Sequence, residues 1–251
     1  MTALEVRALS MAYGGVQALD AVSFSVARGE LLALIGPNGA GKSTCFNIIN
    51  GQIRPDSGSV RIGGRDVTGL GPRRIARLGV GRTFQIAAVF GSMTVLENVR
   101  TACLALAGRS FHLWREARPL FHAEAMALLD LVGLADRADS PAGALAYGDV
   151  KRLELAIALA GTPTLLLMDE PTAGMGPRER RDLIALVRRL VDQRGLAVLF
   201  TEHSMDVVFA HADRVVVLAR GRVIADGDVA SIRADPQVRA VYLGTREDAP
   251  A

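Results

Sequence analysis

Short apolar runs separated by longer stretches with helical spacing dominate the chain. Apolar runs of strand length occur at residues 18–26, 30–35, 164–168, 197–201 and 214–219. Between them, residues 43–50 and 177–194 carry apolar side chains at helical spacing, and Pro177 suits the first turn of a helix. Strands that alternate with helices in this way predict an α/β fold with a mostly parallel core sheet covered on both faces.

The beginning and the middle of the chain depart from this alternation. Residues 4–35 indicate successive strands joined by short turns, and a short strand and turn follow at 59–65. Residues 90–160 show no convincing strand. A capping box at Thr94 and Glu97 predicts a helix to about residue 106, and further helices are predicted at 114–132 and 148–160. We therefore expect an inserted helical lobe.

These patterns predict one domain with an interrupted core. The core comprises residues 1–89, with an N-terminal β region, and residues 162–244. Residues 90–161 form the predicted helical lobe, and residues 245–251 are expected to be a frayed tail.

Composition removes several classes of function. The 29 basic and 26 acidic residues leave a net charge of +3, and aromatic residues make up 5%. Nucleic-acid binding would call for clustered basic or stacking aromatic residues, so no nucleic-acid partner is expected.

Cys45 and Cys103 form no CxxC pair and are expected to be buried apolar side chains. We see no signal peptide and no apolar run near the roughly 18 residues of a membrane span. The chain is expected on the cytoplasmic side, with membrane contact only through partners.

The strongest chemical signal is a glycine-rich turn between the predicted strand 30–35 and helix 43–50. It matches GxxxxGK[ST], in which backbone N–H groups and a helix N-terminus surround phosphate oxygens. Lys42 is expected to contact the β and γ phosphates, Ser43 to bind Mg²⁺, and Thr44 to hydrogen-bond a phosphate. The turn comprises Gly36, Pro37, Asn38, Gly39, Ala40, Gly41, Lys42 and Ser43, with Thr44 directly after it.

Two adjacent acids, Asp169 and Glu170, follow the predicted strand 164–168. By themselves they could be a solvated strand end. Beside a phosphate-binding turn they indicate a division of labour. Asp169 would hold Mg²⁺, and Glu170 would polarise the attacking water as general base.

With these motifs in this order, the chain resembles the nucleotide-binding domains of ABC transporters from about residue 4 to residue 244. The resemblance implies a P-loop ATPase fold of the ABC type that binds ATP and Mg²⁺. It also implies that Tyr13 stacks on adenine and that Gln85 reaches Mg²⁺ and the attacking water. His203 would contact the γ-phosphate. Glu170, His203, Gln85 and Lys42 are then the residues expected to act in hydrolysis.

The resemblance extends to residues that serve a second subunit. Residues 173–176 match the D-loop. In the signature sequence, the start of a helix presents N–H groups to the γ-phosphate held by the opposite subunit. ATP is thus expected between two chains. Two departures, Ala146 for the usual serine and Gly176 for the usual aspartate or asparagine, leave the strength of these contacts open. The matching signature residues are Leu145, Ala146, Tyr147, Gly148 and Asp149.

Softer features resemble the branched-chain amino acid uptake branch, in particular the longer of its two ATPase subunits. They are the sixty positions between Gln85 and Leu145 and the sequences at 202–206 and 236–244. This implies a second ATPase subunit, two transmembrane permeases and a periplasmic or extracellular solute-binding protein. A heterodimer at the cytoplasmic face of the inner membrane is expected, with a homodimer as the alternative.

Three other functions stay open. The solute could be urea or another small molecule, since this chain does not touch it. A non-transport ATPase acting on DNA or ribosomes usually has two cassettes or a long coiled coil, for which 251 residues leave no room. A subunit that binds ATP but hydrolyses it poorly is disfavoured by the presence of Glu170, Gln85 and His203.

Overall fold

The central sheet of the protein is mostly parallel, as the alternation of strands and helices predicts. The computed structural model describes residues 1–83, 89–107 and 121–243. Within these ranges, the strand order of the sheet is β10-β9-β3-β8-β7-β6, and only the β9–β10 pairing is antiparallel. The strands are β3 (Leu31–Ile35), β6 (Val80–Thr83), β7 (Leu165–Asp169), β8 (Ala197–Thr201), β9 (Arg214–Ala219) and β10 (Arg222–Gly227).

The N-terminal strands form a separate antiparallel sheet in the order β2-β1-β4-β5. Gly14 and Gly15 join the first two strands, and both have positive φ, which the tight turn of a hairpin requires. This confirms the predicted N-terminal β region. The strands are β1 (Thr2–Tyr13), β2 (Val16–Ala27), β4 (Ser57–Ile62) and β5 (Arg65–Asp66).

Both faces of the central sheet are buried, because alternate residues of each strand pack into different cores. In β3, Leu31, Ala33 and Ile35 belong to the core that contains the long helices. Leu32 and Leu34 belong to the core formed with α1 and the N-terminal sheet. Side chains alternate along a strand with a period of two, so a strand buried on both faces reads as a continuous apolar run.

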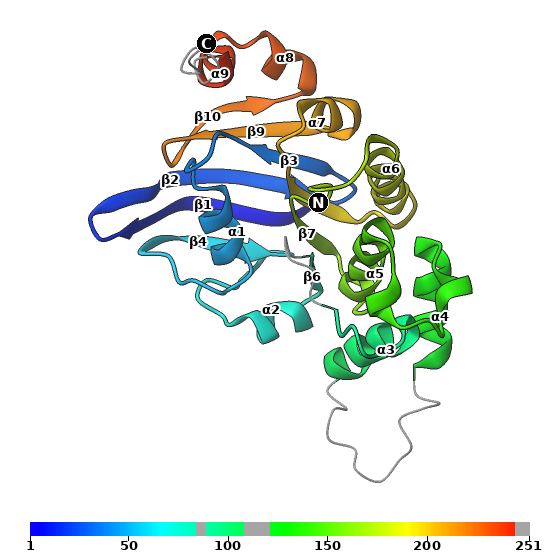
Figure 1. The fold of residues 1–251 in the computed structure, drawn as a ribbon. Coiled ribbons are helices and arrows are strands. Elements are labelled where there is room, and N and C mark those ends of the chain that lie inside the picture. Colours follow the sequence, from blue (N-terminus) through cyan, green and yellow to red (C-terminus); the bar gives the residue numbers. More distant parts are fainter. Residues whose placement is uncertain (84–88, 108–120, 244–251) are drawn as a thin grey trace.

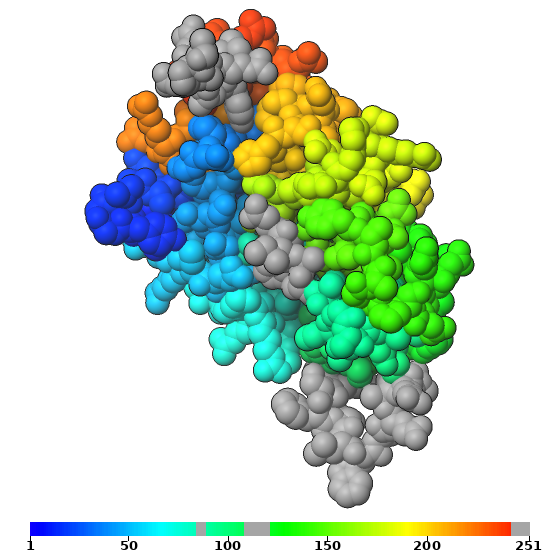
Figure 2. All heavy atoms as spheres, in the orientation of Figure 1, coloured from blue at the N-terminus to red at the C-terminus, as the bar shows by residue number. Residues whose placement is uncertain are grey.

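Three of the helices form the lobe predicted in the middle of the chain. Helices α3, α4 and α5 pack on one another, and their green atoms gather on one side of the molecule, away from the blue atoms of β1 (Figures 1 and 2). The predicted limits of this lobe, residues 90 and 161, remain a prediction. The helices are α1 (Lys42–Ile49), α2 (Pro72–Arg77), α3 (Val95–Leu106), α4 (His122–Val132), α5 (Tyr147–Leu159), α6 (Pro177–Arg194), α7 (Met205–His211), α8 (Val229–Ala234) and α9 (Pro236–Leu243).

One predicted helix begins later than expected. The pattern predicts a helix from residue 114 to residue 132, but α4 begins at His122. Phe121 has φ 59°, in the left-handed region, so the helix cannot continue through it. Residues 108–120 lie outside the described part of the chain.

The capping box predicted at the start of α3 is confirmed: the Glu97 N–H donates to Thr94 Oγ1, and the Thr94 N–H donates to Glu97 Oε2.

Two further expectations concern the cysteines and the membrane. Cys45 and Cys103 are free and buried, and burial raises the pKa of the Cys45 thiol to about 12. In the described ranges, every helix is too short or too polar to cross a bilayer.

Candidate functional site

The predicted chemical residues meet at one edge of the central sheet. The phosphate-binding turn follows β3, Asp169 ends β7, and Thr201 ends β8. These strands are parallel neighbours, with β8 between β3 and β7. Their carboxyl ends therefore lie side by side, where open α/β sheets bind ligands.

The turn after β3 encloses a pocket of about 310 Å³. Two of its glycines are sterically required: a Cβ on Gly36 would lie 2.2 Å from the Leu218 carbonyl oxygen, and one on Gly41 would lie 2.5 Å from that of Ala18. The pocket brings Tyr13 and the turn together with Glu170 and His203, as predicted. Its lining residues are Tyr13, Ala18, Asn38, Gly39, Ala40, Gly41, Lys42, Ser43, Thr44, Glu170 and His203.

The start of α1 makes this pocket attractive to anions. Its first N–H groups have no partner within the helix, and no side chain caps the Gly41 end. Beside it, Lys42 Nζ donates to the carbonyl oxygens of Gly36, at 2.6 Å, and Pro37, at 3.0 Å. Burial lowers the pKa of Lys42, and the charges of Glu170 and Asp169 oppose this. Lys42 thus rests on the turn, in a position from which it can reach phosphates.

Asp169, at the end of β7, is held from two sides. Its Oδ1 accepts a hydrogen bond from the Thr201 hydroxyl at 2.8 Å. Its Oδ2 lies 3.8 Å from an Arg82 guanidinium nitrogen. The same guanidinium reaches Asn47 on α1 at 2.9 Å, and burial lowers the pKa of Arg82 although Asp169 opposes this. Arg82, which the motifs did not single out, thus connects β6, α1 and β7 behind the pocket.

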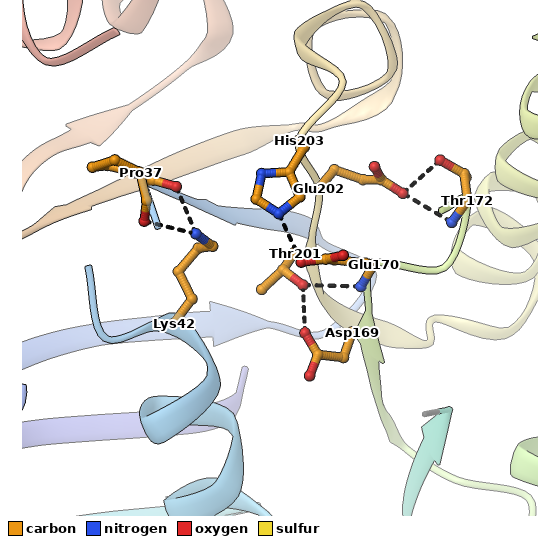
Figure 3. A network of polar contacts seen from close by, with 9 residues as sticks. Pro37, Lys42, Asp169, Glu170, Thr172, Thr201, Glu202 and His203 are labelled. Carbon is orange, nitrogen blue, oxygen red and sulfur yellow. Dashed lines mark hydrogen bonds and ion pairs between the residues drawn. The ribbon is translucent and has the colours of Figure 1, made fainter. Parts of the chain in front are cut away.

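Glu170 adopts an uncommon backbone conformation. Its φ of 47° lies in the left-handed region, which costs a residue with a Cβ about 1–2 kcal/mol. Its N–H donates to Thr201 Oγ1 at 3.0 Å, and its Oε1 lies 2.7 Å from His203 Nε2. The predicted general base, Glu170, and the histidine predicted to contact the γ-phosphate, His203, are therefore hydrogen-bonded to each other in this structure (Figure 3).

A buried carboxylate connects the two loops that carry these residues. Glu202 is 4% exposed and Thr172 is 1% exposed. Glu202 Oε1 accepts hydrogen bonds from the Thr172 N–H at 3.0 Å and from its hydroxyl at 2.7 Å. Sequence reasoning missed Thr201, Glu202 and Thr172. The available signal was the run of polar residues 201–203 directly after a buried strand.

The signature residues lie elsewhere on the molecule, at the start of α5, and none of them lines the pocket. Ala146 and Tyr147 are exposed, whereas Gly148 is buried. The Tyr147 hydroxyl donates to the Ala173 carbonyl oxygen at 3.1 Å. A Cβ on Gly148 would lie 2.7 Å from Glu179 Oε1. The signature thus packs against the predicted D-loop of its own chain; Leu145 and Asp149 beside it are half-buried.

The residues available for Mg²⁺ fit its usual mode of binding. In the described ranges, no cluster of three His, Cys, Asp or Glu side chains could enclose a metal. Mg²⁺ commonly uses one or two carboxylates together with the phosphates of a nucleotide. Asp169 and Ser43 supply a carboxylate and a hydroxyl near the turn. Gln85, the third predicted ligand, lies outside the described residues.

Two family models match the chain. The model described as "ABC transporter" matches residues 19–173, which is more than half of the chain. A second, described as "Branched-chain amino acid ATP-binding cassette transporter", matches residues 222–248.

Individual relatives extend the similarity to nearly the whole length. The high-affinity branched-chain amino acid transport ATP-binding protein BraF of Pseudomonas aeruginosa is 39% identical, over 96% of this chain and 97% of its own. The corresponding protein LivG of Escherichia coli is 37% identical with the same coverage. Among solved structures, the ADP conformation of MJ1267, an ATP-binding cassette of an ABC transporter, has a TM-score of 0.87 and 32% identity, covering 97% of this chain and 99% of that one.

Proposed function

Since this chain belongs to the ABC transporter family and is an ABC ATPase, we propose that it powers the import of branched-chain or related amino acids. The observation that carries the proposal is the pocket that unites the phosphate-binding turn with Glu170 and His203. The amino acid class is supported by the names of the relatives and by the C-terminal family match. Urea or another small solute is the alternative.

The arrangement assigns a task to each residue of the pocket. The turn and the N-terminus of α1 bind the phosphates of ATP, with Tyr13 at the mouth for adenine. Lys42 exchanges the loop carbonyls for phosphate oxygens. Ser43 and Asp169 would hold Mg²⁺, which when bound neutralises charge on the β and γ phosphates. Glu170 accepts a proton from the attacking water, and His203 orients Glu170 and meets the γ-phosphate. Gln85 is proposed as the further contact of Mg²⁺ and water.

The signature would serve the ATP of a second ATPase subunit. Ala146 and Tyr147 are exposed at the start of α5, and they do not line the chain's own pocket. A helix start that faces outward suits an anion held by another chain. One solved relative, the ATP-binding cassette MJ0796, is a dimer in a post-hydrolysis state bound to ADP and phosphate, with a TM-score of 0.76 and 25% identity. We infer that ATP closes a pair of ATPase subunits and that hydrolysis reopens it. The pair is expected to be a heterodimer, with a homodimer as the alternative.

The remaining partners would connect this pair to solute. Two transmembrane permeases would hold the chain at the cytoplasmic face of the inner membrane, and a solute-binding protein would act on the other side. Phe90 is a candidate contact because its side chain is 58% exposed, whereas Val89 beside it packs against the core.

The replacement Glu170→Gln tests the chemistry. It keeps the size of the side chain and removes its basicity, so ATP binding should persist while turnover falls about 10²–10⁴-fold. Steady-state phosphate release and ATP binding by calorimetry, both in the assembled complex, measure the two effects. Turnover near the wild-type level would remove Glu170 from the role of base.

The solute is tested separately in sealed vesicles that contain the complete transporter. Uptake of labelled leucine, driven by ATP at the face that exposes this subunit, should stop with Glu170→Gln. Uptake of labelled urea instead of leucine would favour the alternative solute. ATP turnover without any solute uptake would favour a function outside transport.

A further inference from the structure

Thr201 lies at the last position of β8, opposite Asp169 at the end of β7 and within hydrogen-bond distance of Glu170, the next residue. Thr201 is fully buried, with 0% exposure, so its side chain can contact neither bulk water nor ATP directly. Figure 3 shows its hydroxyl pointing at the junction of Asp169 and Glu170. A buried hydroxyl needs a hydrogen-bond partner, and here the partners belong to the site itself.

One oxygen atom of Thr201 joins both acids. A hydroxyl carries one hydrogen to donate and lone pairs to accept. The Thr201 hydroxyl donates to Asp169 Oδ1 at 2.8 Å and accepts from the Glu170 N–H at 3.0 Å. It thereby fixes the carboxylate orientation of Asp169 and the backbone orientation of Glu170 at the same point.

The second of these bonds acts on a residue whose backbone is under strain. Glu170 has φ 47°, and such conformations persist only when the surrounding structure holds them. The Thr201 bond restrains the peptide that leads into Glu170, while His203 restrains the carboxylate at the other end of the same residue. Without the hydroxyl, the peptide can rotate toward an unstrained conformation and carry the carboxylate away from His203.

We propose that Thr201 is a positioning residue for ATP hydrolysis, which sets the geometry of the Mg²⁺ ligand Asp169 and of the general base Glu170. The proposal rests on the functions proposed above for these two acids. It assigns to Thr201 no contact with ATP, so its effect belongs to the chemical step and not to the binding of nucleotide.

The replacement Thr201→Val is the direct test, because valine has the shape of threonine without the hydroxyl. In the assembled complex, kcat should fall about 10- to 100-fold, as expected when a catalytic group is displaced by a fraction of an ångström to one ångström. KM for ATP should change less than about threefold, because the phosphate-binding turn is untouched. Thr201→Ser keeps the hydroxyl and should restore most of kcat.

Thr68 provides a control away from the site. It is a half-buried threonine, and its hydroxyl accepts from the Val60 N–H at 2.9 Å and donates to the Val60 carbonyl oxygen at 3.5 Å. Thr68→Val removes a hydroxyl that also accepts from a backbone N–H and should leave kcat within about threefold of wild type. An equal loss of kcat in both variants would show a general effect of hydroxyl loss and would overturn the proposal.

A double-mutant cycle decides whether Thr201 acts through Glu170. In single-turnover measurements, Thr201→Val should cost much less in a Glu170→Gln background than in wild type, because interacting residues are not additive. An equal cost in both backgrounds would overturn the proposed route. If Glu170→Gln alone keeps full turnover, the base function of Glu170 fails, and this result is separate from the effect of Thr201.

A readout without catalysis tests the connection to Asp169. Mn²⁺ in place of Mg²⁺, observed by electron paramagnetic resonance with ATP and the Glu170→Gln subunit, should give a changed spectrum when Thr201 is valine, while its affinity changes less than about threefold. Thermal melting checks folding, and Thr201→Ala, which cannot clash, takes the place of valine if the valine variant is unfolded. An unchanged Mn²⁺ spectrum together with unchanged kcat would overturn the proposal.

Discussion

At the scale of single residues, the site depends on charges that are held in buried surroundings. Lys42 is 8% exposed, and burial lowers its pKa from the usual value for lysine. Phosphate groups near the ammonium would raise that pKa again, because an opposite charge favours the charged form. We therefore expect ATP binding to be coupled to the protonation of Lys42.

This coupling predicts a loss of ATP affinity at alkaline pH. In the free protein, burial lowers the pKa of Lys42 from the ordinary 10.5, so at pH values above that lowered pKa we expect bound ATP to bring about the uptake of a proton. Affinity should fall as pH rises past the lowered pKa and stay level below it. Calorimetry in two buffers of different ionisation enthalpy measures the proton uptake directly.

Lys42→Arg is the matched control for the pH effect. Arginine keeps its charge at every accessible pH, so binding to this variant should show no proton uptake and a flat pH profile. An alkaline loss as large as in wild type would assign the titration to another group.

The sequence revealed some of the site residues and missed others for a physical reason. Lys42, Ser43 and Asp169 belong to local motifs, in which a few adjacent residues contain the whole chemical signal. Thr201 and Arg82 act on Asp169 from other strands, and no local pattern records which residues will be neighbours in a sheet. The polar run 201–203 pointed at His203 but did not distinguish Thr201 from an ordinary strand end.

At the scale of elements, the start of α5 is the feature most open to improvement. Its N-cap residue, Ala146, has extended backbone and no side-chain hydrogen bond to the helix. Serine is among the preferred residues at this position because its oxygen accepts from a free N–H. Tyr147 and Gly148 nevertheless pack against the D-loop and Glu179, so the helix start is already well placed.

Ala146→Ser should therefore have two separable effects. In the isolated subunit, the new cap should add about 1 kcal/mol to the free energy of unfolding, or about 2–4 °C in Tm. In complexes made hydrolysis-dead by Glu170→Gln, the hydroxyl should also lower the ATP concentration for half-maximal closure, by at most the roughly 1.5–3 kcal/mol of a hydrogen bond to a charged group.

The two measurements locate any failure of this prediction. A higher Tm with an unchanged closure midpoint would mean that the backbone N–H groups at the start of α5 already satisfy the γ-phosphate held by the partner subunit. A lower midpoint with an unchanged Tm would mean that the hydroxyl serves the phosphate and does not cap its own helix.

Elements with one dominant pattern were predicted to within a residue or two. The helix α6 and the strands β8 and β9 match their predicted bounds, since α6 has a proline start and a glycine end, and the strands are apolar except for Thr201 and Arg214 at their ends. The start of α4 was wrong because amphipathic spacing continues past the point where the backbone of Phe121 turns away. The edge strand β10 and the short helices α8 and α9 were not predicted, because β10 mixes apolar and charged residues and the two helices, of 6 and 8 residues, are too short to show a clear apolar period.

At the scale of the whole molecule, one exposed apolar side chain is conspicuous. Phe90 is 58% exposed, yet its backbone is fixed: its N–H donates to Asn98 Oδ1 at 2.8 Å, and its carbonyl oxygen accepts from the Asn98 amide at 3.1 Å. A rigidly presented aromatic side chain is typical of the centre of a protein interface. We therefore expect Phe90 to be a contact for a permease.

Phe90→Asp should abolish assembly with the permeases while folding and ATP binding persist. The buried carboxylate would lack a partner at the interface, but in the free subunit it would face water. Co-purification with the permeases measures assembly, and Tm and nucleotide binding measure the rest.

Val16→Asp is the matched control, since Val16 is 71% exposed on the N-terminal hairpin and should leave assembly intact. Loss of folding in Phe90→Asp would show that Phe90 packs within the lobe, and intact assembly would move the permease contact elsewhere.

The order of strands in the central sheet also has a consequence for folding during synthesis on the ribosome. The central strand β3 pairs with β8 and β9, whose first residues are translated about 160 and 180 residues later, or roughly 8–36 seconds at 5–20 residues per second. During that time Leu31–Ile35, an uninterrupted apolar run, has no sheet to join, although the N-terminal hairpin of β1 and β2 can already form. The nascent chain therefore depends on that hairpin, or on a chaperone, to shield β3 until the last quarter of the chain emerges.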